Sequence, residues 1–77
     1  MTTVYVKLDS IEKIKEFNRE ICHFTCDFDL EQGRYYIDAK SMLGILSLDL
    51  SASLQLHYSA DENEAQAIEE AIKPYLA

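Results

Sequence analysis

The chain has 77 residues, 48% of them hydrophobic, and its formal net charge at pH 7 is −7. This length predicts one small domain over residues 1–77, and the charge disfavours binding to nucleic acid or to anionic membranes. No apolar run reaches the ~20 residues of a membrane span. The amino terminus lacks the basic start and long apolar segment of a signal peptide, so we expect a cytoplasmic protein.

The first part of the chain predicts a strand followed by a helix. Val4, Val6 and Leu8 alternate with polar neighbours, as in a half-buried strand. Asp9 or Ser10 then caps a helix. The apolar residues of this helix recur at steps of three and four and would form one buried face, at Ile11, Ile14, Phe17 and Ile21.

Strict alternation of apolar and polar residues over residues 22–30 predicts a second strand of about nine residues. In such a strand Cys22 and Cys26 would lie ~13 Å apart on the helix-facing side, too far apart for a disulfide. We therefore expect both cysteines to be reduced and buried. His23, like His57 in the fourth strand, is expected to be exposed on the open face of the sheet. No spacing of these residues resembles a metal motif, and no cofactor is predicted.

The second part of the chain predicts two more strands and two more helices. Gln32 and Gly33 form a turn into a strand over residues 34–38. A short helix over residues 40–47 and a strand over residues 53–58 follow. The last helix begins after Asp61, with Glu64 placed as in a capping box, and Pro74 ends it or distorts its last turn. Its buried face would comprise Ala65, Ile68, Ala71, Ile72 and Tyr75.

The element order βαββαβα, with one apolar face on each element, predicts an α+β fold with two layers. A four-stranded antiparallel sheet would carry three helices on one face. A right-handed first crossover places strands one and two parallel, with another strand between them. The strand order 1-4-2-3 satisfies this requirement.

One stretch suggests a family. It reads Lys40-Ser41-Met42-Leu43-Gly44-Ile45-Leu46-Ser47-Leu48. It resembles the start of the second helix in HPr, the histidine-containing phosphocarrier of the bacterial sugar phosphotransferase system. There a Lys-Ser, two apolar residues, a glycine, two apolar residues and Ser-Leu occur in the same order. The resemblance implies the HPr-like open-faced β-sandwich with strand order 1-4-2-3, and a link to sugar transport and carbon regulation.

The family's other signature is missing. HPr proteins carry their phosphate-accepting histidine in a Gly-Ile-His-Ala-Arg-Pro loop at the start of the first helix. Here Asp9, Ser10, Ile11 and Glu12 occupy that place. None of them is a histidine-type acceptor, and the two carboxylates would repel a phosphate. We therefore predict that no phosphohistidine forms under phosphotransferase conditions. No serine or cysteine has a base close by in the sequence that is placed to activate it, so we also expect that the protein is not an enzyme.

Two interpretations remain open for the HPr-like stretch. Ser41 would cap the second helix, a contribution of about 1 kcal/mol, or would be a regulatory phosphorylation site. In many low-GC Gram-positive HPr proteins the matching serine is phosphorylated by an ATP-dependent kinase, and the modified form binds a transcriptional regulator. Met42, Leu43 and Leu46 would either close the small core or form the patch that docks partner proteins.

The sequence thus predicts a non-catalytic HPr-like regulatory or adaptor domain. It would dock a protein partner through the second helix: a phosphotransferase-system component, a serine kinase or a transcriptional regulator. Ser41 is the candidate phosphorylation site, and the docking residues would be Lys40, Met42, Leu43, Leu46 and Ser47. The alternative is an active phosphocarrier of the same system that uses a displaced acceptor residue.

Overall fold

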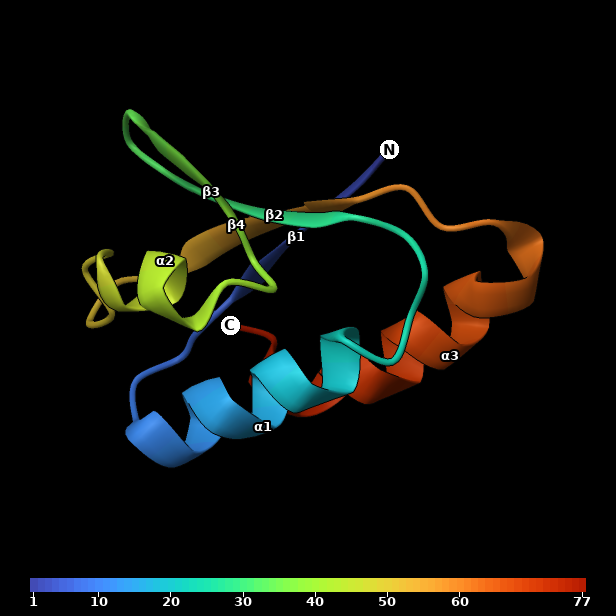
Figure 1. The fold of residues 1–77 in the computed structure, drawn as a ribbon, viewed down its shortest axis with the longest axis horizontal. Helices are drawn as coiled ribbons and strands as arrows, with labels where there is room; N and C mark the ends of the chain where they lie inside the picture. The colour runs from blue at the N-terminus through green and yellow to red at the C-terminus, as the bar shows by residue number, and fades with distance from the viewer.

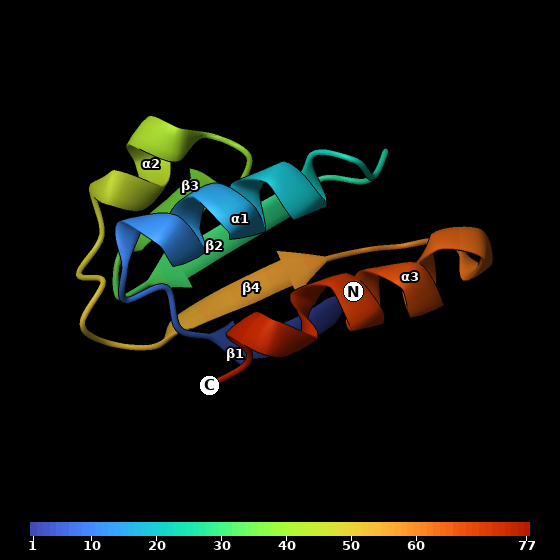
Figure 2. The ribbon, with the colours of Figure 1, turned by 90° about the horizontal axis from the view of Figure 1, so that it is seen from below.

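The computed structural model describes residues 1–77 and has two layers, a sheet and a layer of helices on one side of it (Figure 1). The strands are β1 (Thr2–Val6), β2 (Phe28–Gln32), β3 (Tyr35–Asp38) and β4 (Leu54–Tyr58). The helices are α1 (Ile11–Ile21), α2 (Met42–Leu46) and α3 (Glu62–Ile72), followed by a 3₁₀ turn, η1 (Lys73–Tyr75). Seen from below, all three helices lie in front of the sheet (Figure 2). None of them is both long and apolar enough to cross a membrane.

The sheet is antiparallel throughout, in the order β1-β4-β2-β3. Tyr58 at the end of β4 pairs with Thr2 on one side and with Phe28 on the other. Because β1 and β2 are both antiparallel to β4, they run parallel to each other and are separated by it. The predicted fold class, strand order and placement of the three helices are confirmed.

The end of the chain returns to the outer edge of β1. The amide of Lys7 donates to the carbonyl of Tyr75 at 2.8 Å, and the amide of Ala77 donates to the carbonyl of Tyr5 at 3.0 Å. Pro74 lies inside η1, so the predicted distortion after the last helix is present. These contacts bring the end of α3 beside β1 and the end of β4.

The core lies between the sheet and the helices. Phe17, Phe28, Leu56 and Ile68 are fully buried in it, and the ring of Phe17 packs edge-on against that of Tyr75 at a centroid distance of 5.5 Å. Ile11 was predicted in the same buried face but is 54% exposed. It occupies the first position of α1, and the buried face begins only at Ile14.

The nine-residue strand predicted over residues 22–30 is wrong, because β2 begins only at Phe28. The reason is the partner strand: β4 ends at Tyr58, opposite Phe28, and leaves residues 22–27 with no neighbour to pair with. Cys22 instead ends α1, with its amide bonded to the carbonyl of Asn18 at 3.1 Å. The apolar positions of the alternating pattern still face the core, since Phe24 and Cys26 are partly buried against it.

The predicted capping box of α3 forms only in part. The Asp61 side chain accepts from the amide of Glu64 at 3.0 Å, as predicted. The Glu64 carboxylate does not turn back to the cap. It accepts instead from the hydroxyl of Thr25 at 2.9 Å and from the amide of Thr25 at 3.2 Å. This pair of bonds fastens the irregular segment before β2 to the start of α3.

Candidate functional site

Serines hold both ends of α2. Ser41 has extended backbone angles, φ −89° and ψ 111°, and its hydroxyl accepts from the amide of Gly44 at 3.2 Å. At the other end, the hydroxyl of Ser47 donates to the carbonyl of Gly44 at 2.6 Å. A helix of five residues has little stability of its own, so these bonds matter more than they would in a long helix. Ser41 therefore caps α2, as predicted, and it is exposed to solvent.

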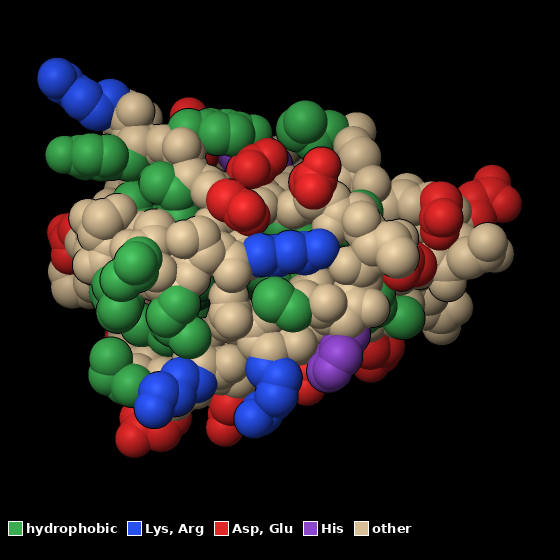
Figure 3. Space-filling model, viewed as in Figure 1, with side chains coloured by type: hydrophobic (Ala, Val, Ile, Leu, Met, Phe, Trp, Pro, Cys, Tyr) green, Lys and Arg blue, Asp and Glu red, His purple; other side chains and the backbone are tan.

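The apolar side chains of α2 divide into two sets. Ile45 is fully buried, and Met42 is partly buried against the core. Leu43 is 82% exposed and Leu46 is 45% exposed. Figure 3 shows hydrophobic side chains gathered over α2 on the face in view. We use the name α2 surface for the exposed residues of this end of the molecule, which are Ser41, Leu43, Leu46 and Ser47.

Lys40, which precedes the α2 surface, is engaged within the chain. Its ammonium donates to the carbonyl of Phe24 at 2.8 Å and lies 5.7 Å from the centre of the Phe28 ring. Its own carbonyl accepts from the side chain of Asn18 at 2.9 Å. Lys40 thus ties the segment before α2 to the end of α1. Its charge is engaged by these partners within the chain.

The start of α1 is capped by Ser10, and an ion pair between Asp9 and Lys13 lies beside the cap. The Ser10 hydroxyl accepts from the amide of Lys13 at 3.1 Å, and the ammonium of Lys13 pairs with Asp9 at the same distance. The hydrogen bond and the charge of Lys13 lower the pKa of the exposed Asp9 carboxyl. One of the amides that a phosphate would use at this helix start, that of Lys13, is therefore already bound to Ser10, and the Asp9 carboxylate lies beside it.

His57 is buried, contrary to the predicted exposure, in the centre of the open face of the sheet. Its Nδ1 lies 2.8 Å from the hydroxyl of Thr3, and its Nε2 lies 2.9 Å from a carboxylate oxygen of Glu31. The ring of Tyr36 stacks on the imidazole at a centroid distance of 5.8 Å and an angle of 15°. Both ring nitrogens are occupied. Thr3, Glu31 and His57 occupy polar positions of the alternating pattern in three strands, which places them on the open face. Only the register of the strands brings the three side chains into contact.

His23 lies in the turn after α1, not in a strand, and is exposed as predicted. Its amide donates to the carbonyl of Glu20 at 3.3 Å, at the end of the helix. The two histidines therefore do not share a face or a site. No three His, Cys, Asp or Glu side chains are grouped so that they could hold a metal ion.

Comparison with known proteins agrees with this geometry. Residues 12–77 match the family model described as "PTS HPr component phosphorylation site". The fold is similar to the crystal structure of HPr-C-His from Thermoanaerobacter tengcongensis, with a TM-score of 0.79 and 22% sequence identity. That similarity covers 97% of this chain and 91% of the other. No curated protein matches the chain.

Proposed function

Because this chain belongs to the HPr family of the phosphotransferase system, we propose that it is a non-catalytic regulatory or adaptor domain. It docks a protein partner through the α2 surface. The observation that supports this proposal most directly is the exposure of Leu43 and Leu46 on a helix that is capped at both ends. Residues 9–12, where the family has its acceptor histidine, contain no histidine.

The two leucines suit a docking role because their burial would be favourable and their helix is already formed. Full burial of an exposed leucine contributes roughly 1.5–3 kcal/mol, so Leu43 and Leu46 together offer a few kcal/mol toward binding. A preformed helix loses little further backbone entropy on binding. Met42 and Lys40 contribute less directly, since one packs on the core and the other is bound to Phe24. Ser47 lies at the edge of the surface.

Phosphorylation of Ser41 would regulate this docking. A phosphate adds about −1.5 to −2 charges at pH 7 and several strong acceptor oxygens. Placed beside Leu43, this charge would repel an acidic partner and attract a basic one. The exposed hydroxyl of Ser41 leaves the site open to a kinase. The partner classes in this proposal are a phosphotransferase-system component, a serine kinase and a transcriptional regulator.

The second candidate function is an active phosphocarrier with a displaced acceptor, and His23 is the residue that favours it. His23 is exposed, whereas both ring nitrogens of His57 have partners. Against this role, His23 follows the carboxyl end of α1, where the helix dipole disfavours a phosphate. The adaptor proposal therefore remains the better supported of the two.

Labelled phosphate separates the two functions. The chain is incubated with phosphoenolpyruvate and the first enzyme of the phosphotransferase system, and acid-labile phosphate is counted. We expect none above background in the wild type or in His23→Ala. Stoichiometric label that His23→Ala abolishes would establish the phosphocarrier instead. A parallel incubation with ATP and the family's serine kinase should label Ser41, and Ser41→Ala should remove that label.

Docking is tested by calorimetric titration against the three partner classes, taken from the organism that encodes this chain. Leu43→Ala should weaken binding at least tenfold and leave the melting temperature within about 2 °C, since an exposed side chain contributes little to folding. Leu76→Ala is the matched control, because Leu76 is 46% exposed and lies far along the chain from α2. Equal affinities of the Leu43 and Leu76 variants would overturn the docking proposal.

A further inference from the structure

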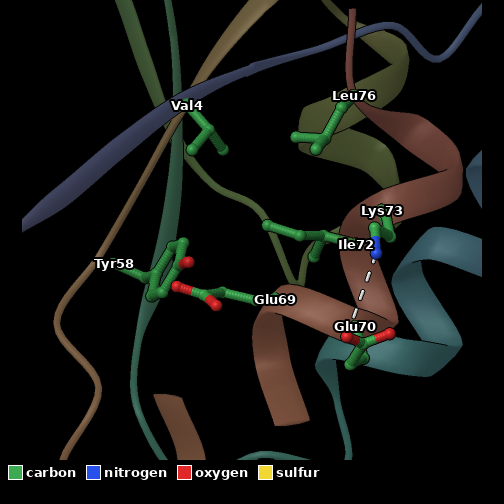
Figure 4. A pocket seen from close by; sticks show the side chains of 7 residues that line it. All are labelled: Val4, Tyr58, Glu69, Glu70, Ile72, Lys73 and Leu76. Atoms are coloured by element: carbon green, nitrogen blue, oxygen red, sulfur yellow. Dashed lines mark ion pairs between the residues drawn. The ribbon is translucent and has the colours of Figure 1, made fainter. Parts of the chain in front are cut away.

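A pocket of about 310 Å³ lies between β1, the end of β4 and the last turns of α3. Val4, Ile72 and Leu76 form its apolar walls. Val4 and Tyr58 face it from the strands, and Ile72, Leu76 and Glu69 face it from α3 and the residues that follow (Figure 4). Figure 4 shows the Glu69 carboxylate turned toward the hydroxyl end of Tyr58. The pocket shares no residue with the α2 surface, so its ligand is independent of the proposed function.

Two polar groups of this pocket, the Tyr58 hydroxyl and the Glu69 carboxylate, have no hydrogen-bond or ion-pair partner within the chain. Tyr58 is only 3% exposed, yet its hydroxyl has no hydrogen bond within the chain. The protein has no fully buried polar side-chain atom without a partner, so this hydroxyl keeps some contact with solvent, and Figure 4 shows it at the pocket beside Glu69. Glu69 has no ion pair either. The neighbouring carboxylate of Glu70 pairs with Lys73 at 4.0 Å, on the outer side of the pocket.

The electrostatics of Tyr58 agree with the position of Glu69 beside it. Burial, and then the negative charge of Glu69, raises the pKa of the Tyr58 hydroxyl. The phenol therefore stays neutral at physiological pH and can offer an oxygen lone pair to a donor. The carboxylate and the phenol oxygen are both acceptors that a single cationic donor could satisfy.

The charge and the shape of the pocket narrow the class of ligand. An anion would meet Glu69 and Glu70, with only Lys73 to offset them, on a chain of net charge −7. A wholly apolar ligand would take water from the Glu69 carboxylate and give it no partner. At ~30 Å³ for each water-sized group, the pocket holds roughly ten such groups, which suits a short alkyl chain with one polar head.

We propose that this pocket binds an alkylammonium group. The ammonium donates to the Glu69 carboxylate and to the Tyr58 oxygen. The alkyl chain lies against Val4, Ile72 and Leu76. The group is supplied either by a free aliphatic amine or by a lysine side chain of a peptide.

The test is an NMR titration of the isotope-labelled full chain with n-hexylammonium at pH 7. We expect saturable shifts at Tyr58, Ile72 and Leu76, and none at Leu43. Sodium hexanoate and hexan-1-ol, which keep the alkyl chain and change the head, should bind at least tenfold more weakly. Glu69→Gln should weaken hexylammonium at least tenfold, whereas Glu62→Gln, in the first turn of the same helix, should not.

Two further experiments complete the test. One identifies the source of the ammonium, and the other uses a variant that keeps the fold. A capped Gly-Lys-Gly peptide and its Nε-acetyl form are titrated in the same way. If the unmodified peptide binds and the acetylated peptide does not, the pocket accepts a peptide lysine in addition to a free amine. Tyr58→Phe keeps the packing and should weaken binding severalfold. No saturable shift with either ammonium ligand would overturn the proposal, and so would equal affinity for hexanoate or an unchanged affinity in Glu69→Gln.

Discussion

Gly44 of α2 lies directly against Ile37 of β3. A Cβ added at Gly44 would stand 3.1 Å from Cδ1 of Ile37 and 3.4 Å from its Cβ. Contacts between carbon atoms are most favourable at about 3.5–4.0 Å, so a larger residue at this position requires the Ile37 side chain to shift by a few tenths of an ångström. Glycine lets the short helix sit close to the edge of the sheet.

Gly44→Ala should therefore destabilise the protein by about 1 kcal/mol, because overpacking outweighs the gain in helix propensity. Ile37→Val removes Cδ1 and should by itself cost about 0.5–1.5 kcal/mol. The double variant should lose at least about 0.5 kcal/mol less than the sum of the two single variants. Urea unfolding of the four proteins measures this coupling. Strict additivity would show that the contact does not hold α2 in place.

Ser41→Ala should cost about 1 kcal/mol of unfolding free energy, because it removes the bond to the amide of Gly44. Ser41→Asp should be nearly neutral, since a carboxylate can cap the same amide. Ser10→Ala is the matched control, because Ser10 caps α1 through the same geometry. If Ser41→Ala costs nothing while Ser10→Ala costs about 1 kcal/mol, Ser41 does not cap the helix in solution.

Glu64→Ala should destabilise the protein by about 1–2 kcal/mol, because two bonds from Thr25 to a charged acceptor are lost. Glu62→Ala removes a carboxylate from the same helical turn and breaks no such bond, so it should cost less than about 0.5 kcal/mol. Amide hydrogen exchange gives a second measurement. The amide of Thr25 should exchange faster in Glu64→Ala and at the wild-type rate in Glu62→Ala.

The two cysteines should react at different rates, which corrects the sequence-based expectation that both are protected. Cys22 is exposed at the end of α1, and both thiols are free. Burial raises the pKa of the partly buried Cys26 thiol, with the charge of Glu64 as a smaller cause. A raised pKa leaves less thiolate at a given pH, so Cys26 should be labelled more slowly at pH 8.

Peptide mapping after a short exposure to a thiol reagent measures this difference. Cys22→Ser should remove the fast phase and Cys26→Ser the slow one. In denaturant the two rates should converge, because the difference arises from folding. Fast labelling of Cys26 in the native protein would mean that the segment over residues 22–27 does not pack against the core in solution.

Local patterns were enough to predict the order of the elements and their arrangement. Alternation and helical spacing follow from backbone geometry over a few residues. The order β1-β4-β2-β3 satisfies the handedness of crossovers and is the order that the resemblance to HPr implies. Ser41 and Asp61 could be predicted as caps for the same reason. A cap depends on the residue and on an amide only three positions further along the chain.

Contacts between distant residues were decided only by the tertiary structure. Thr3 meets His57 across 54 positions of sequence, and the burial of that imidazole depends on strand register. Likewise β2 starts at Phe28 because its neighbour β4 ends opposite that residue, although the alternation begins at Cys22. In α2, the pattern of apolar residues could not separate the buried Ile45 from the exposed Leu43. The side on which α2 packs against α1 and β3 makes that choice.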